Sequence, residues 1–325
     1  NISYLQIKGK EKQSKVLIFL PGLGAYKENY IRYAESLVSN YKSVYILDLP
    51  EQGSKGEWTI GNMVDNLKEF IRKIDVSSIS EIHLAGHSAG AVAIISFLCN
   101  MNKTIENVLL NSNREAIKTN VSSNLIEMGF GQSPMESKKV TKLFLYSPCD
   151  SFANVFPKFF VKQLMQLNEK KAMWIMDVLI NMPSRLLKRI TFKKKFNFQI
   201  NPSKKPQYFR LVLNNHKAFF NYIYNYKCIF ELKEMLDSKL REQINETLSK
   251  KRIVIQFGSF DWLLISKNRC KREMLNNFKV CNNIEIIEHN NLGHFLYKPF
   301  SLDLNLNNQM LINSSVINTS LNYIA

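Results

Sequence analysis

Long apolar runs, cysteine and acidic residues are all scarce in this sequence, and each shortage excludes a class of protein. No segment reaches the roughly 20 apolar residues that are needed to span a bilayer. The first fifteen residues are rich in lysine and have no apolar core behind them, so we expect no signal peptide. We therefore expect a soluble protein of the cytoplasm.

Cysteine occurs five times, an odd number at wide spacings, and never as the pair CxxC. So few cysteines, odd in number, make a disulfide-stapled secreted fold unlikely, and the lack of CxxC pairs argues against a structural zinc site. We therefore expect these thiols to be buried and reduced. They are Cys99, Cys149, Cys228, Cys270 and Cys281.

Acidic residues are outnumbered, with 27 Asp and Glu against 44 Lys and Arg, and the formal net charge is +17. Most of the excess lies between Ser151 and Phe230, where 15 basic and two acidic residues give a net +13. Such a patch favours an anionic partner, which could be a membrane surface, an acidic substrate or a nucleic acid. No DNA- or RNA-binding motif is visible, so we do not expect nucleic acid.

Short apolar, β-branched runs alternate with segments of helical periodicity through much of the chain. This alternation predicts the α/β class, with a mostly parallel central sheet and helices on both faces. Helices are expected over Glu28–Ser39, Met63–Ile74 and Ala91–Cys99. The expected strands are Lys15–Leu20, Ser43–Leu49, Glu81–Ala85, Val140–Tyr146, Ile253–Phe257 and Ile284–Glu288, and Ile2–Ile7 could add an antiparallel edge strand.

Two stretches do not fit this alternation, Met101–Lys139 and a second, longer one that predicts another structural unit. Residues 148–250 are helical in pattern, aromatic and very basic. A connection of this length inside a domain is usually functional. We therefore predict a core formed by residues 1–147 and 251–325, with a helical cap over 148–250 inserted between two sheet strands.

The residues from Gly86 to Gly90 read Gly-His-Ser-Ala-Gly and fit the pattern G-x-S-x-G. The pattern follows an expected strand and precedes an expected helix, which is the setting of a nucleophile elbow. The serine then lies on a sharp turn, where the two glycines avoid collisions with the neighbouring strand and helix. We predict that Ser88 is a catalytic nucleophile.

A nucleophilic serine needs a base, and the base needs an acid to orient it. In elbow folds both follow the serine, each just beyond a strand. His294 lies in a glycine-containing loop after the last expected strand and is the predicted base, whereas His289 at the strand end is predicted to be structural. Asp261 follows the preceding strand and is the predicted acid. Asp150, after an earlier strand, is the alternative acid.

The reaction also needs two N–H groups that converge on the developing oxyanion. One is the amide of Ala89, directly after the nucleophile and at the start of a helix. The other should come from the loop Pro21-Gly22-Leu23-Gly24 after the first strand of the parallel set. We predict Leu23, because the flanking glycines allow its amide to turn inward.

Five stretches occur in the order FLPGLGAYKENYIRYAESL, VYILDLPEQGSKGEW, GHSAG, GSFDW and LGHF. Together they resemble the α/β-hydrolase fold, and the first two are most similar to its monoglyceride lipase and lysophospholipase (serine aminopeptidase-like) branch. The resemblance covers roughly residues 15–100, 140–150 and 250–300. It implies hydrolysis of a carboxylic ester of a fatty acid, with neither a metal nor an organic cofactor.

We therefore predict a serine hydrolase that acts on an acyl or lipid-like substrate through an acyl-enzyme. The same triad could instead serve an acyltransferase or a thioesterase on an acyl-thioester. A catalytically silent α/β-hydrolase fold that acts as a binding protein is the third class.

The basic, aromatic cap suggests where such a substrate comes from. Its composition is typical of peripheral contact with an anionic membrane surface, worth about 1 kcal/mol per cation. The same charge could receive an acyl carrier through a phosphopantetheine group. A solvated face of a lysine-rich protein is the alternative interpretation.

Overall fold

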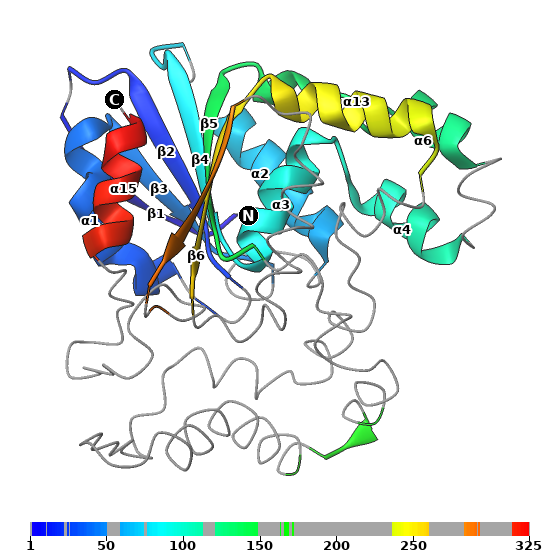
Figure 1. Ribbon diagram of the computed structural model, residues 1–325, viewed down its shortest axis with the longest axis horizontal. Coiled ribbons are helices and arrows are strands. Elements are labelled where there is room, and N and C mark those ends of the chain that lie inside the picture. The colour runs from blue at the N-terminus through cyan, green and yellow to red at the C-terminus, as the bar shows by residue number, and fades with distance from the viewer. Residues whose placement is uncertain are drawn as a thin grey trace.

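A computed structural model describes most of the predicted core (Figure 1). The described residues are 2–10, 12–22, 25, 27–50, 59–74, 77–112, 121–148, 163, 166–168, 171, 236–259, 283–290, 292 and 314–324. Among the helices in these ranges, none has the length and apolarity to cross a membrane.

A seven-stranded sheet forms the centre of the described structure, in the order β1-β3-β2-β4-β5-β6-β7. β1 pairs antiparallel with β3, and all other neighbours are parallel. The predicted α/β class and antiparallel edge strand are therefore confirmed, with strand ends within two residues of those expected. The strands are β1 (Tyr4–Lys8), β2 (Lys15–Leu20), β3 (Ser43–Leu47), β4 (Glu81–His87), β5 (Val140–Tyr146), β6 (Arg252–Gly258) and β7 (Ile284–His289).

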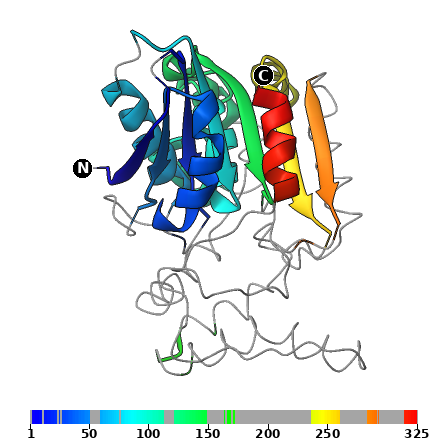
Figure 2. The same cartoon turned by 90° about the vertical axis from the view of Figure 1, so that its left-hand side faces the viewer.

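Helices cover both faces of the sheet (Figure 2). α1 (Ile31–Leu37) and α15 (Ser314–Ile324) pack on one face, and α2 (Ile60–Lys73), α3 (Ala89–Leu98) and α13 (Ser238–Ser249) pack on the other. Alternate residues of each strand point into the two cores, so the central strands carry apolar residues on both faces. The remaining helices are η1 (Lys27–Tyr30), η2 (Val38–Asn40), α4 (Lys103–Asn111), α6 (Ser122–Glu127) and η4 (Met135–Ser137).

α2 begins three residues earlier than the apolar spacing predicts. Its first turn is capped by Thr59, whose hydroxyl accepts the N–H of Asn62 at 3.1 Å. The buried carboxylate of Glu106, from α4, accepts the N–H of Gly61 at 2.6 Å. An anionic side chain at this position complements the positive end of the helix dipole. Hydrogen bonds to polar capping groups therefore determine where this helix starts. Such groups add nothing to the periodic spacing of apolar residues, so the pattern could not show them.

α13 lies at the end of the range predicted as the cap. Its apolar face, which includes Leu240, Ile244 and Leu248, belongs to the core cluster shared with α2 and α3. Thr247 also donates its hydroxyl to the carbonyl of Gly131 at 2.8 Å. The division of the chain into core and cap stays a prediction, because nearly all other residues of that range lie outside the described structure.

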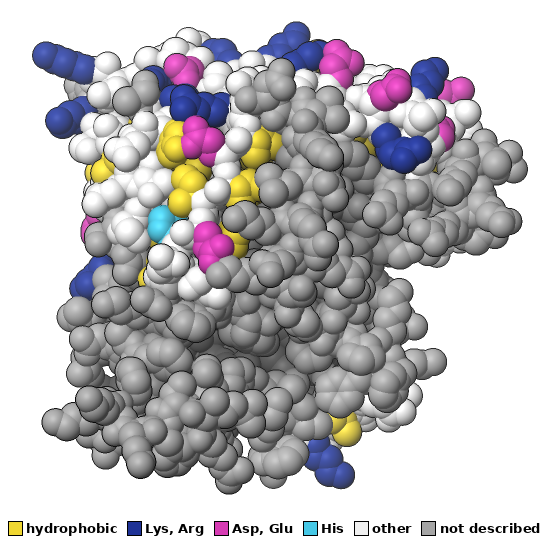
Figure 3. Space-filling model, in the orientation of Figure 1, with side chains coloured by type: hydrophobic (Ala, Val, Ile, Leu, Met, Phe, Trp, Pro, Cys, Tyr) yellow, Lys and Arg dark blue, Asp and Glu magenta, His cyan; other side chains and the backbone are white. Residues whose placement is uncertain are grey.

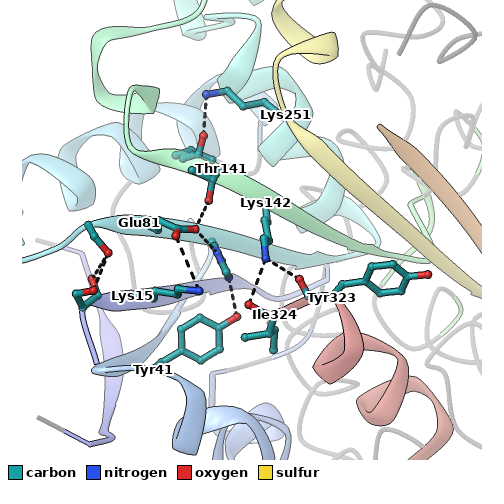
Figure 4. A network of polar contacts seen from close by, with 12 residues as sticks. Lys15, Tyr41, Glu81, Thr141, Lys142, Lys251, Tyr323 and Ile324 are labelled. Atoms are coloured by element: carbon teal, nitrogen blue, oxygen red, sulfur yellow. Dashed lines mark hydrogen bonds and ion pairs between the residues drawn. The ribbon is translucent and has the colours of Figure 1, made fainter. Parts of the chain in front are cut away.

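Polar contacts link the amino-terminal ends of the strands to the last helix (Figure 4). Glu81, at the start of β4, accepts the hydroxyl of Thr141 at 2.9 Å. The ammonium of Lys142 donates to the carbonyls of Tyr323 and Ile324, at 2.9 and 3.2 Å. These carbonyls end α15, where a cation is favourable. The last helix is thus fixed to the sheet at the amino-terminal ends of the parallel strands.

β7 forms one edge of the sheet, and its side chains are less enclosed than those of the central strands. Ile284, Ile286 and Ile287 are only partly buried. In the space-filling view, apolar side chains accordingly reach the surface beside acidic ones (Figure 3).

Candidate active site

A single residue, Ser88, connects β4 to α3. Its backbone has φ 53° and ψ −118°, a conformation that costs free energy for a residue with a side chain. Ser88 is the N-cap residue of α3, but its side chain makes no capping hydrogen bond. The sharp strand-to-helix turn that the G-x-S-x-G pattern predicts is therefore present.

Two glycines allow this turn to pack against its neighbours. A Cβ on Gly90 would lie 2.3 Å from the carbonyl oxygen of Leu20 and 2.4 Å from that of Pro21. A Cβ on Gly86 would lie 2.7 Å from the backbone nitrogen of Ala91. These neighbours are main-chain atoms and cannot move aside cheaply. The close approach of backbones therefore requires glycine at both positions.

The loop after β2 lies directly against the elbow. A Cβ on Gly22 would come within 2.7 Å of the Nδ1 of His87 and 3.2 Å of the Cβ of Ser88. Ala89 is buried and begins α3, so its N–H is one of the first four that have no acceptor within a helix. Leu23, the predicted second oxyanion donor, follows Gly22 in sequence but lies outside the described residues.

The predicted base and acids also lie outside the described residues, namely His294, Asp261 and Asp150. What the structure describes is where their loops begin. β6 and β7 are adjacent, with Gly258 opposite His289, and the N–H of Ser259 donates to the carbonyl of His289 at 2.9 Å. Both loops therefore leave the same edge of the sheet as the elbow does.

At the carboxyl end of β7, His289 belongs to a chain of hydrogen-bonded polar side chains. Its Nε2 is 2.8 Å from the Oε1 of Gln256, and its Nδ1 is 3.4 Å from the hydroxyl of Ser315. Gln256 donates its amide to Ser320 at 3.0 Å, so its oxygen must accept the proton of His289. Burial lowers the pKa of His289. These contacts fit the structural role that the sequence predicts for His289.

The polar chain continues across the sheet through two tyrosines. The Tyr146 hydroxyl lies 2.8 Å from that of Ser320 and 2.6 Å from that of Tyr33. Burial raises the pKa of Tyr146 to about 12, so it stays a neutral hydroxyl. The chain thus links α1, β5 and α15 by neutral hydrogen bonds.

Sequence reasoning missed one contact at the elbow. The hydroxyl of Tyr30 and the Nδ1 of His87 form a buried hydrogen bond of 3.0 Å. His87 precedes the nucleophile, and Tyr30 ends the short helix η1 after the Gly22 loop. The two residues are 57 positions apart, so no local pattern could have paired them.

Other sequence predictions can be placed in the described ranges. Cys99 is buried and free, as expected for a reduced thiol. No group of three or more His, Cys, Asp or Glu residues in these ranges could hold a metal ion.

Neither the scan against protein-family models nor the search of curated proteins gives a match to the chain. Solved structures do match. MGS-M2, an α/β-hydrolase enzyme from a deep-sea metagenome library of the Medee basin, is 14% identical with a TM-score of 0.55, over 90% of this chain and 87% of the other. A carboxylesterase structure from the thaumarchaeon Nitrososphaera gargenis is 12% identical with a TM-score of 0.53, over 99% and 94%. The monoacylglycerol lipase of Paleococcus ferrophilus is 12% identical with a TM-score of 0.51, over 100% and 98%.

These matches establish the fold. The strand order, the antiparallel first strand and the helices on both faces are those of an α/β-hydrolase fold. The fold class predicted from the sequence is confirmed.

Proposed function

We propose that this protein is a serine hydrolase that cleaves a carboxylic ester of an acyl or lipid-like substrate. The observation that carries the proposal is the strained backbone of Ser88 at the only position between β4 and α3. A serine held at φ 53° by two obligatory glycines costs stability, and such strain is concentrated at functional sites. The resemblance to solved esterases and lipases in fold supports the same class.

In the proposed reaction, His294 removes the proton of Ser88 as its oxygen attacks the ester carbonyl carbon. Asp261 orients the imidazole and stabilises its charged form. The amides of Ala89 and Leu23 bind the oxyanion, where the loss of one donor typically costs about 3–4 kcal/mol. The alcohol leaves with the proton from His294, and water then hydrolyses the acyl-enzyme. No metal or cofactor takes part.

A fluorophosphonate probe tests the nucleophile. We expect one adduct, on the peptide that contains Ser88, and none in Ser88→Ala. The matched control is Ser96→Ala, because Ser96 is a buried serine of the same helix whose Oγ makes no hydrogen bond. That variant should label like the wild type. Labelling that persists in Ser88→Ala would refute the proposal.

The acid is assigned by a pair of variants. Asp261→Asn should lower kcat by about 10⁴-fold, since the imidazole then loses its orienting carboxylate. Asp150→Asn should leave kcat nearly unchanged. The reverse result would assign the role to Asp150, the alternative acid.

A substrate panel separates ester hydrolysis from the alternatives on the same triad. We expect release of acid from p-nitrophenyl esters, monoglycerides or lysophospholipids, with water as acceptor. Faster turnover of acyl-thioesters would indicate a thioesterase, and product formation only with an added alcohol would indicate an acyltransferase. Full biological activity of Ser88→Ala would favour a binding protein.

We further propose that the basic residues of the predicted cap bind an anionic membrane surface. The support is the net +13 between Ser151 and Phe230. The protein should co-sediment with phosphatidylserine vesicles and not with neutral ones. Replacing Lys193, Lys194 and Lys195 by glutamine should weaken this binding. Binding to an acyl carrier protein in place of vesicles would assign the charge to that partner.

A further inference from the structure

The short helix η1 is bonded at both ends to parts of the protein far away in sequence. Its first residue, Lys27, contacts the end of β3, and its last residue, Tyr30, contacts the elbow. The loop that is predicted to supply the second oxyanion donor lies between β2 and this helix. The inference that follows rests on the proposed function.

The first anchor is the carboxylate of Asp48, whose side chain is fully buried. Its Oδ1 accepts the main-chain N–H of Lys27 at 3.0 Å, and its Oδ2 accepts the hydroxyl of Ser3 at 2.8 Å. The Lys27 ammonium forms an ion pair with the same carboxylate. Burial lowers the pKa of Lys27, but the hydrogen bond and charge of Asp48 outweigh it and raise that pKa. Loss of Lys27 would leave the buried carboxylate of Asp48 without its ion-pair partner, which is costly, so the start of η1 is firmly placed.

The second anchor is the bond between Tyr30 and His87. Both side chains are buried, and the Tyr30 ring packs on Phe19 of β2 with centroids 4.4 Å apart. A phenylalanine could fill the same space, so the hydroxyl is not needed for packing. What the hydroxyl adds is a directional link between η1 and the residue beside Ser88.

The loop after β2 also contacts the elbow directly. Gly22 packs against His87 and Ser88, and its carbonyl accepts the N–H of Ala25 at 3.1 Å. Ser88 therefore lies against the start of this loop, and η1 fixes the position where the loop ends.

We propose that Tyr30, His87 and Asp48 are positioning residues that fix Gly22 and Ala25 relative to Ser88, so that the Leu23 amide expected between them is preorganised for the oxyanion. Preorganised donors act on the transition state and not on the bound substrate. Small displacements of such a donor are costly, and about 1 Å can reduce the rate by about 100-fold. The effect should therefore fall on kcat and leave KM unchanged.

The test compares two neighbouring tyrosines. Tyr30→Phe and Tyr33→Phe each remove one buried hydroxyl bond from rings that pack on Phe19. We expect Tyr30→Phe to lower kcat on a p-nitrophenyl ester by at least about tenfold, with KM within about twofold. Tyr33→Phe should lower the unfolding midpoint by a similar amount and keep the wild-type kcat. Equal kcat values in the two variants would overturn the proposal.

Rescue at His87 provides a second measurement. His87→Asn keeps a hydrogen-bonding atom close to the position of Nδ1, whereas His87→Leu does not. We expect kcat to be near wild type in the first variant and reduced in the second. Equal losses in both would overturn the proposal. Fluorophosphonate labelling of the wild type separates the two hypotheses, because a wild type that does not label refutes the proposed function, whereas normal labelling in all variants refutes only the positioning role.

Discussion

The main-chain N–H of Ser88 donates to the carbonyl of Tyr146 at 2.8 Å, which bonds the elbow to the end of the neighbouring strand. Ser147, the first residue after that strand, donates its N–H to the carbonyl of Gln256 at 2.7 Å. Ser147 also has a positive φ of 43°. The carboxyl ends of β4, β5 and β6 are therefore linked in series, and loops that leave this edge start from fixed positions.

The Gly22 position gives a prediction about the distance between the loop and the nucleophile. Gly22→Ala introduces a methyl group 2.7 Å from the Nδ1 of His87, so either the loop or the buried His87 ring beside Ser88 must shift. We expect a loss of about 1–3 kcal/mol in the free energy of unfolding and a fall of about 100-fold in the rate of fluorophosphonate labelling. Urea unfolding and labelling kinetics measure the two effects. A labelling rate within about twofold of wild type would show that the loop does not take part.

Ser320 gives a prediction about stability alone. Its hydroxyl bonds to Tyr146, to Gln256 and to the carbonyl of Val316. Ser320→Ala leaves two buried groups without this partner, at a cost of about 1–3 kcal/mol for each unsatisfied group. Urea unfolding should show this loss, with the labelling rate of Ser88 unchanged.

The matched control for Ser320 is Asn318→Ala. Asn318 lies on the exposed side of the same helix. Its replacement should change the free energy of unfolding by less than about 0.5 kcal/mol. Equal effects of the two variants would mean that the hydroxyl network contributes nothing specific.

His83 gives a prediction about pH. Burial lowers its pKa to about 4, against the opposing effect of its hydrogen bond to the carboxylate of Glu81, and the charges of Lys142 and Lys15 act in the same direction as burial. The unfolded chain binds a proton at this residue near its ordinary value of 6.5. The stabilisation is therefore complete above about pH 6.5 and is lost as the pH falls through about 4, by roughly 3 kcal/mol in total.

Urea unfolding at pH 7, 5.5 and 4.5 measures this loss. His83→Gln should show a shallower decline with falling pH, whatever its stability at pH 7. The ring of His83 is fully buried and its Nδ1 lies 2.9 Å from the hydroxyl of Tyr41. Its proton resonances should accordingly not titrate above about pH 5. A midpoint near 6.5 would contradict this account.

Most strands were predictable from the sequence because they are short apolar runs that end at glycine, proline or a polar residue. β2 and β5 have the predicted ends, Lys15–Leu20 and Val140–Tyr146. Parallel strands buried on both faces leave this signal in a single stretch of chain. The start of α2 was predicted too late, since Thr59 and Glu106 determine it through hydrogen bonds.

The candidate site was predictable only where its residues are adjacent in sequence. Ser88 and its glycines form one motif, and their geometry follows from steric requirements of a single turn. The contacts of Tyr30 with His87 and of Tyr146 with Ser320 join residues 57 and 174 positions apart. Such pairs depend on the folded sheet and leave no local pattern. The roles of Asp261, His294 and Leu23 stay predictions.

The central claim is that Ser88 becomes acylated with His294 as its base. The most direct measurement is the intact mass of the protein, quenched in acid within milliseconds of mixing with a p-nitrophenyl ester. We expect one acyl group, located on Ser88, that forms in wild type and Ser96→Ala and fails to accumulate in His294→Ala and Ser88→Ala. An acyl group on another residue, or acylation at the wild-type rate in His294→Ala, would contradict the account.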